Sequence, residues 1–314
     1  MRAFGLDLDI GFDAPGLDSR FLARLPSRQT RQTRLRLVAP SAFDAWPPPG
    51  TQTVAGAIED GPSYEIRRHH RRDYVLRHDA FGRFRVRADG GAVDCALGDH
   101  PGWYWQRFMC GQLLPLAALL QGLEPFHASG VARDGRAYLF MGASGAGKSS
   151  VAAQLAARGL LFMADDVAAL ELVNGEVIAY PGAALATLAS SELRELATVT
   201  GGAWQHLGCV DGEVRVTVPA GSMESRALPV GGIYLLQREG GGDRVRVERQ
   251  EPSVATLVGA TFNAYHTEPE RLSRQLRLCA RLSGKVPLHR VRVPPSASAA
   301  RTAEALVAHG GSGP

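Results

Sequence analysis

A short glycine-rich segment carries the residues whose types and spacing point most directly to chemistry. Residues 142–149 read Gly-Ala-Ser-Gly-Ala-Gly-Lys-Ser and match G-x-x-x-x-G-K-[ST] at every fixed position. Glycine tolerates positive φ and lets backbone N–H groups surround a phosphate without Cβ clashes. In such a loop Lys148 reaches the β- and γ-phosphates of a nucleotide, and the Ser149 hydroxyl binds Mg²⁺. The predicted nucleotide-binding residues are Gly142, Ala143, Ser144, Gly145, Ala146, Gly147, Lys148, Ser149 and Ser150.

The flanking sequence favours a phosphate-binding loop over an ordinary glycine-rich turn before a core helix. The apolar run 137–141 predicts a buried strand, and the helix formers at 148–158 predict a helix that Gly159 ends. Strand, loop and helix in this order are the context that such a motif requires. Lysine occurs only at positions 148 and 285 in a chain otherwise rich in arginine. This bias indicates a specific need for an ammonium group at Lys148.

Two adjacent carboxylates, Asp165 and Asp166, follow the loop after one short helix. They end the apolar run 160–164, which reads as a strand. Because ligands bind where buried strands end at the edge of an α/β sheet, we expect both side chains near the phosphates. One carboxylate can coordinate Mg²⁺ while the other accepts the proton of an attacking hydroxyl. The spacing does not decide which does which, and a polar strand end that caps a turn is the structural alternative.

A histidine precedes the loop. Residues 125–136 read as a strand that ends in an Asp-Gly turn, and we expect this strand to form a hairpin with 138–141. His127 would then lie beside the phosphate loop, where an imidazole can exchange protons near neutral pH. A purely structural histidine is equally compatible with the sequence.

Further elements are expected along the rest of the chain. The Asn174-Gly175 pair predicts a tight hairpin between strands at 167–173 and 176–180. Helical patterns cover 190–196, 254–264, 268–281 and 297–308. Strand patterns cover 4–10, 35–38, 213–218, 228–237, 244–249 and 286–293.

Length and composition limit the class of protein. With 314 residues and 45% hydrophobic content, the chain can bury a full core and divide into two domains. A helical stretch at 103–121, broken near Pro115, marks the expected boundary. We predict a β-rich N-terminal domain at 1–110, a P-loop domain at 111–309 and a flexible tail at 310–314. The four cysteines are dispersed and the apolar runs are short, which favours a reducing, cytoplasmic setting without a membrane partner.

The most basic part of the sequence is residues 64–87. Alternation in Phe-Arg-Val-Arg at 84–87 predicts a strand with one solvated face. Such a surface could bind nucleic acid or an acidic peptide. We favour a solvated hairpin face, because acidic residues interrupt the run and the alternation already explains it.

Three motifs together resemble the catalytic domain of the HPr kinase/phosphorylase family and its smaller relatives. They are Phe-His-Ala-Ser-Gly-Val at 126–131, the glycine loop at 142–149 and Met-Ala-Asp-Asp at 163–166. The resemblance covers residues 123–182 well and the rest of the C-terminal half loosely. The family includes stand-alone kinases, some from gene clusters for ribosomally made peptides such as lasso peptides.

This resemblance implies an α/β fold, with a P-loop kinase domain of the HPr kinase/phosphoenolpyruvate carboxykinase type after a smaller β-rich domain. It also implies ATP- and Mg²⁺-dependent phosphate transfer to a serine hydroxyl. By position, Ser149 and Asp166 would bind the metal, Asp165 or Asp166 would activate the acceptor, and His127 would assist near the γ-phosphate. The catalytic residues so implied are Asp165, Asp166, His127 and Lys148.

The sequence also departs from the family pattern. Position 143 is Ala where the family commonly has Asp, and Arg215 and Arg226 are only weak candidates for its downstream arginine signature. These differences argue against phosphorylase activity and against HPr as the substrate. A peptide or small protein is therefore the expected acceptor, with the basic N-terminal surface as a docking face.

Three functions remain in competition. We favour a serine kinase over a small-molecule kinase or carboxykinase-like transferase, and over a non-catalytic nucleotide-binding regulatory module. A nucleic-acid partner is disfavoured, because the arginine-rich stretches lie outside the P-loop half. We expect the protein to form a homo-oligomer.

Overall fold

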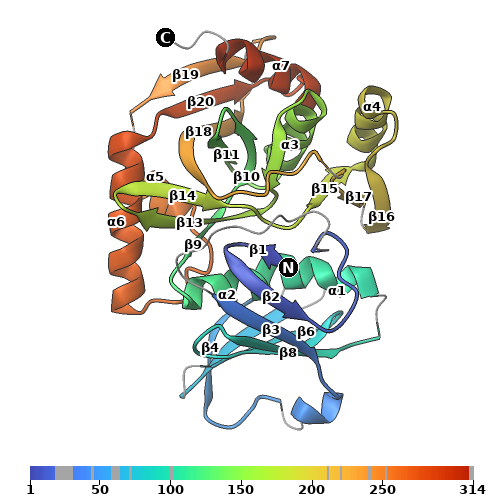
Figure 1. The fold of residues 1–314 in the computed structure, drawn as a ribbon, viewed down its shortest axis with the longest axis vertical. Helices are drawn as coiled ribbons and strands as arrows, with labels where there is room; N and C mark the ends of the chain where they lie inside the picture. Colours follow the sequence, from blue (N-terminus) through green and yellow to red (C-terminus); the bar gives the residue numbers. More distant parts are fainter. Residues whose placement is uncertain are drawn as a thin grey trace.

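The described residues form a mixed α/β fold with three sheets (Figure 1). The structure is a computed structural model. It describes residues 1–17, 31–43, 46–57, 64–70, 73–99, 102–210, 212–219, 221–239, 242–251 and 253–310. Residues 311–314 of the expected tail, and much of the arginine-rich segment before residue 31, lie outside this set. No helix within these ranges is long and apolar enough to cross a membrane.

Alternation of apolar and polar residues builds the N-terminal half into an eight-stranded sheet. Ile66, Leu76 and Phe84 lie on one face and are fully buried. The strand order is β1-β2-β3-β8-β7-β6-β5-β4. Its strands are β1 (Arg2–Ala3), β2 (Leu6–Ile10), β3 (Gln32–Leu37), β4 (Thr51–Ala57), β5 (Tyr64–His69), β6 (Tyr74–His78), β7 (Gly82–Val86) and β8 (Ala92–Leu97). The strand expected over 4–10 begins only at Leu6, because Phe4 and Gly5 have positive φ and form a turn.

A helical run packs against the buried face of this sheet. It consists of α1 (Gly102–Phe108), a π-helical turn at Met109–Leu113 and α2 (Leu114–Leu120). Pro115 lies in the first turn of α2, directly after the π-helical turn, and the helical run continues through the expected break. The boundary expected after residue 110 falls inside this run.

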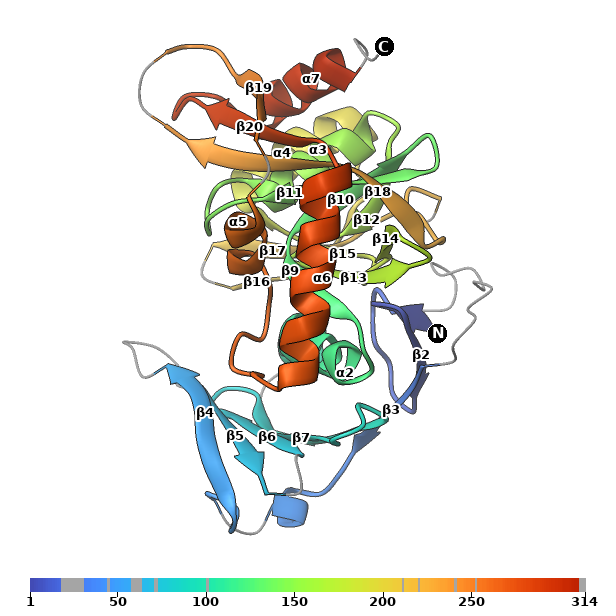
Figure 2. The same ribbon diagram turned by 90° about the vertical axis from the view of Figure 1, so that its left-hand side faces the viewer.

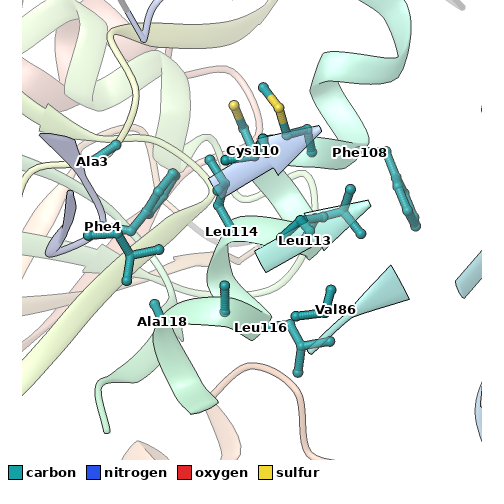
Figure 3. Close-up of a cluster of buried hydrophobic side chains, with 14 of the residues drawn as sticks. Ala3, Phe4, Val86, Phe108, Cys110, Leu113, Leu114, Leu116 and Ala118 are labelled. Carbon is teal, nitrogen blue, oxygen red and sulfur yellow. The ribbon is translucent and has the colours of Figure 1, made fainter. Parts of the chain in front are cut away.

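The core around these helices draws on both halves of the chain. Phe84 and Leu113 belong to the same buried cluster as Val167 and Leu185 from the C-terminal half. Figure 3 shows part of this cluster, with Phe4 near Leu114. The N-terminal sheet and the P-loop half therefore share one core.

The C-terminal half is organised around a nine-stranded sheet. Its central strands β11, β18 and β20 are parallel, and its order runs β12-β10-β11-β18-β14-β13-β9, with β20 beside β18 and β19 beside β20. The strands are β9 (Glu124–His127), β10 (Ser129–Arg133), β11 (Arg136–Met141), β12 (Leu161–Ala164), β13 (Val167–Val173), β14 (Glu176–Tyr180), β18 (Leu228–Arg238), β19 (Arg246–Gln250) and β20 (Leu288–Val293). Asn174 and Gly175 both have positive φ, as the predicted hairpin turn requires.

Helices cover both faces of this sheet, because its strands are apolar on both sides. Phe140 packs in one cluster with α3 (Lys148–Ala157) and α7 (Ala299–Gly310). Leu139 and Met141 pack on the other face with α5 (Val254–Gly259) and α6 (Pro269–Lys285), which crosses the front of Figure 2. The helix expected over 254–264 is shorter than predicted and ends at Gly259.

A small third sheet stands beside α3. It orders its strands β15-β17-β16 and carries α4 (Ser190–Thr200). The strands are β15 (Leu185–Ala189), β16 (Gln205–Val210) and β17 (Glu213–Thr217). Only β17 follows from the sequence pattern; β15 and β16 do not.

Candidate active site

The glycine loop joins β11 to α3, as predicted. Gly142 has φ 148°, and a Cβ there would lie 2.5 Å from the carbonyl oxygen of Leu236 on the neighbouring strand. Gly147 has φ 94° and begins α3. Only glycine meets both requirements, namely close backbone approach and a left-handed conformation. The loop leads directly into the N-terminus of α3, where backbone N–H groups without helical partners can bind an anion.

Lys148 binds the backbone of the loop that precedes it. Its side chain is buried, and Nζ donates hydrogen bonds to the carbonyl oxygens of Gly142 at 3.0 Å and Ala143 at 3.1 Å. Burial lowers the pKa of Lys148, whereas the charges of Asp166 and Asp165 act to raise it. These neutral carbonyl partners can be exchanged for phosphate oxygens, which bind an ammonium group more strongly.

Asp165 is held firmly on both carboxylate oxygens. The Ser129 hydroxyl donates to Oδ1 at 2.8 Å, and the backbone N–H of Thr187 donates to Oδ2 at 2.9 Å. These donors come from β10 and β15, one on each side of the strand end. Asp165 is therefore fixed in orientation before any ligand binds.

Asp166 is held less tightly. It adopts φ 65°, and its Oδ1 lies 3.3 Å from Nδ1 of His127, with 53% of the side chain exposed. Burial of the group and the nearby charge of Asp165 raise its pKa, against the opposing effect of His127, Arg215 and Arg107. The helical run lies close by, because a Cβ on Gly111 would come within 3.6 Å of Oδ2.

The strand through His127 differs from the prediction. Instead of one strand paired with 138–141, the chain forms β9 and β10, which are separated at Ala128. His127 ends β9 and pairs with Val167 of β13, whereas β10 forms the hairpin with β11. The backbone N–H of Ala128 bonds the carbonyl oxygen of Asp166 at 3.2 Å, so the chain changes partners there. His127 still reaches the site, but beside Asp166.

The expected residues converge on one cavity of about 310 Å³ at the mouth of the glycine loop. Ser144, Gly145, Gly147, Lys148, Ser149, Ser150, His127, Asp165 and Asp166 all line it. Gly142, Ala143 and Ala146 instead line an adjoining hollow of about 790 Å³. His127, Ser144, Gly145 and Arg238 border both spaces.

Sequence reasoning missed four charged residues of the smaller cavity. Arg107, Glu192, Glu213 and Arg238 line it, and they come from α1, α4, β17 and the end of β18. Glu192 contacts the Ser150 hydroxyl, and the guanidinium group of Arg238 lies beside Gly147. Each is far from the loop in sequence and in no recognisable motif, so only the fold reveals them.

The cavity fits a magnesium ion bound mainly through a ligand. No group of three or more His, Cys, Asp or Glu side chains with metal-binding geometry occurs in the described ranges. Mg²⁺ in nucleotide sites needs only one or two protein oxygens beside phosphate and water. Ser149 and the two carboxylates line the same cavity and can supply them.

The described arginines of the 64–87 stretch mostly have partners within the fold. Arg67 bonds Thr51, Thr53 and Glu65, Arg68 pairs with Glu268, and Arg83 donates to the carbonyl oxygen of Phe43. Arg71 and Arg72 lie outside the described residues. These side chains therefore serve the N-terminal sheet and its contact with α6.

Comparison with known proteins finds a weak structural likeness and no match at the level of sequence. No protein-family model and no curated protein matches the sequence. Among solved structures, the chain is similar to the Hpr(Ser) kinase/phosphatase from Coxiella burnetii, with 14% sequence identity and a TM-score of 0.31. The match covers 59% of this chain and 95% of that one. A TM-score this low does not establish a shared fold.

Proposed function

We propose that the protein is an ATP- and Mg²⁺-dependent phosphotransferase that transfers the γ-phosphate to a serine hydroxyl of a peptide or small protein. One observation carries the proposal: Lys148, Ser149 and the carboxylates of Asp165 and Asp166 line one cavity at the mouth of a glycine loop. Phosphoryl transfer needs little more than positioned charge and a proton acceptor.

The loop is the natural place for the phosphates. Backbone N–H groups from 142–149 and the N-terminus of α3 would bind their oxygens, and Lys148 would leave the loop carbonyls to join them. Arg238 beside Gly147 adds a second cation at this end. The adjoining 790 Å³ hollow, lined in part by Leu235, Thr256 and Ala260, has room for the nucleoside.

The two aspartates suit different tasks. Within the described part of the chain, the carboxylate of Asp166 has His127 as its one side-chain partner, and its raised pKa suits a proton acceptor. We assign it to the acceptor hydroxyl. Asp165, fixed by Ser129 and Thr187, then shares Mg²⁺ with Ser149, in place of the Asp166 ligand that the family resemblance implies. The metal would supply neutralisation of phosphate charge.

The test is phosphate transfer followed by intact mass. The protein, ATP and Mg²⁺ are incubated with serine-containing peptides and small proteins, beside the Asp166→Asn and Lys148→Ala variants. A gain of about 80 Da on a serine, lost in both variants, is the expected result. Tight ATP binding without any phosphorylated product would instead favour a nucleotide-binding regulatory module. Product on a small alcohol but on no peptide would favour a small-molecule kinase.

A further inference from the structure

The 310 Å³ cavity has a second charged end that the phosphate chemistry does not use. Arg107 in the last turn of α1 and Glu213 at the start of β17 form an ion pair there, with Nη2 and Oε2 2.7 Å apart. Both side chains line the cavity and are about half exposed, at 47% and 50%. The pair therefore faces the space in which an acceptor must lie.

Asp166 lines the same cavity as Arg107 and Lys148. Its charge acts on Lys148, while the charge of Arg107 acts on Asp166. If the phosphates lie along the loop and Asp166 receives the acceptor proton, the groups next to the acceptor hydroxyl point toward Arg107. The ion pair can therefore contact the substrate groups that flank the acceptor hydroxyl.

A second guanidinium group lies next to this end of the cavity. It belongs to Arg215, two residues beyond Glu213 on β17, and is fixed by donation to the Thr187 hydroxyl at 2.5 Å. Thr187 lines the cavity, so Arg215 adds positive charge at the cavity wall, whereas Asp166 and Glu192 add negative charge inside it. A half-exposed ion pair contributes only about 0–1 kcal/mol, so another carboxylate can replace Glu213 on Arg107 at little cost. A guanidinium group binds such a carboxylate through two parallel hydrogen bonds.

We propose that Arg107 is a specificity-determining residue that binds an acidic side chain within a few residues of the acceptor serine. The substrate class is thus a serine-containing peptide segment with flanking Asp or Glu. This inference rests on the proposed function, since it names the acceptor of that same site. A substrate with a basic flanking side chain would instead bind Glu213.

The experiment uses three peptides that differ only beside the serine, as Asp-Ser-Asp, Asn-Ser-Asn and Lys-Ser-Lys. KM and kcat for phosphate transfer are measured for the full-length protein and for Arg107→Ala and Arg107→Lys. Arg133→Ala is the matched control, because it removes an arginine of comparable exposure, 39%, from an ion pair with Asp134 at the end of β10. Circular dichroism confirms that each variant is folded.

Wild type is expected to have a KM for the acidic peptide about tenfold below that for the neutral one. Arg107→Ala should remove this difference and leave kcat within about threefold, whereas Arg107→Lys should keep part of it. Arg133→Ala should behave as wild type. Equal KM values for the three peptides, preference for the basic peptide, or the same result for Arg107→Ala and Arg133→Ala would overturn the inference.

A binding measurement separates this inference from the proposed function. The same peptides with alanine in place of serine carry an uncharged dye, and their Kd is measured by anisotropy with a non-hydrolysable ATP analogue and Mg²⁺ present. Binding of the acidic peptide that depends on Arg107, without transfer to any serine peptide, would reject the kinase and keep the subsite. Transfer that is indifferent to Arg107 would reject the subsite and keep the kinase.

Discussion

His127 Nδ1 lies 3.3 Å from Oδ1 of Asp166, and backbone hydrogen bonds hold both residues in place. The N–H of His127 donates to the carbonyl oxygen of Ala260, and the carbonyl oxygen of Asp166 accepts from Ala128. The ring of His127 also stacks on Phe262, with 6.2 Å between ring centroids. An imidazole and a carboxylate are thereby presented together to the cavity that the glycine loop borders.

Substitution of the two aspartates should have different effects on kcat and on the free energy of unfolding. Asp166→Asn should lower kcat on the order of a hundredfold without destabilising the fold. Because the Asp166 side chain is 53% exposed, and His127 is its one side-chain partner within the described residues, a neutral amide in its place should change the free energy of unfolding little. Urea unfolding and transfer kinetics provide the two readings.

Asp165→Asn should lower both activity and stability. An amide nitrogen that faces either the Ser129 hydroxyl or the Thr187 N–H loses one hydrogen bond, at about 1–3 kcal/mol. Equal stability of the two asparagine variants at pH 7 would contradict the assigned difference between the carboxylates.

Lys148 offers a test with an internal control, since the chain has one other lysine. Lys148→Ala should reduce kcat/KM for ATP on the order of 10²–10³-fold, because the phosphates lose their ammonium partner. Lys285→Ala removes the same charge from an exposed position at the end of α6 and should leave transfer unchanged. A comparable loss in both variants would mean that net charge, not contact with phosphate, sets the rate.

Gly142 should tolerate no side chain. In Gly142→Ala the new Cβ would lie 2.5 Å from the carbonyl oxygen of Leu236, which is closer than van der Waals contact allows. The φ at this position is also one that L-residues rarely adopt. We expect a stability loss of about 1–3 kcal/mol and weaker nucleotide binding by calorimetry. Gly284→Ala in α6 meets nothing within 4 Å and should stabilise by up to about 1 kcal/mol. Unchanged nucleotide affinity in Gly142→Ala would argue against the loop as the phosphate site.

His266 should make stability depend on pH. It is buried against Tyr74, whose hydroxyl lies 2.5 Å from its Nδ1, and burial together with Arg68 and Arg271 lowers its pKa to about 4. The unfolded chain binds this proton near pH 6.5 and the folded chain does not, so stability falls as the pH drops from 6.5 to about 4. The loss is roughly 3 kcal/mol at about 1.4 kcal/mol per pKa unit.

The matched variant for this prediction is His266→Gln, which cannot titrate. Urea unfolding at a series of pH values should give the variant a flatter profile than wild type between pH 6.5 and about 4. Parallel profiles for the two proteins would place the pH dependence on another group.

The parts of the site that depend only on neighbouring residues in the chain could be predicted from the sequence. Gly142 and Gly147 need positive φ wherever such a loop occurs, and the Asn174-Gly175 turn needs it too, so residue type alone predicts these features. The strand before the loop and the helix after it follow from apolar patterning over a few residues. These elements lie where they were expected.

What depends on pairing between distant segments could not be predicted. At Ala128 the chain changes partner: His127 pairs with β13, some forty residues later, whereas Ser129 pairs with β11. Arg107 and Glu213 meet across about a hundred residues, and no local pattern links an arginine in a helix to a glutamate in a strand. The strands β15, Leu-Ala-Thr-Leu-Ala, and β16, Gln-His-Leu-Gly-Cys-Val, lack the strict alternation of apolar and polar residues that made β17, Glu-Val-Arg-Val-Thr, predictable.

The core shared by the two halves bears on how the molecule melts. Because Phe84 and Leu113 are buried together with Val167 and Leu185, neither half can lose its packing without exposing apolar surface of the other. Heat should therefore unfold both halves in one cooperative transition. A nucleotide held only by the glycine loop should raise the Tm of the distant eight-stranded sheet as well, and removal of the N-terminal half should leave no folded remainder.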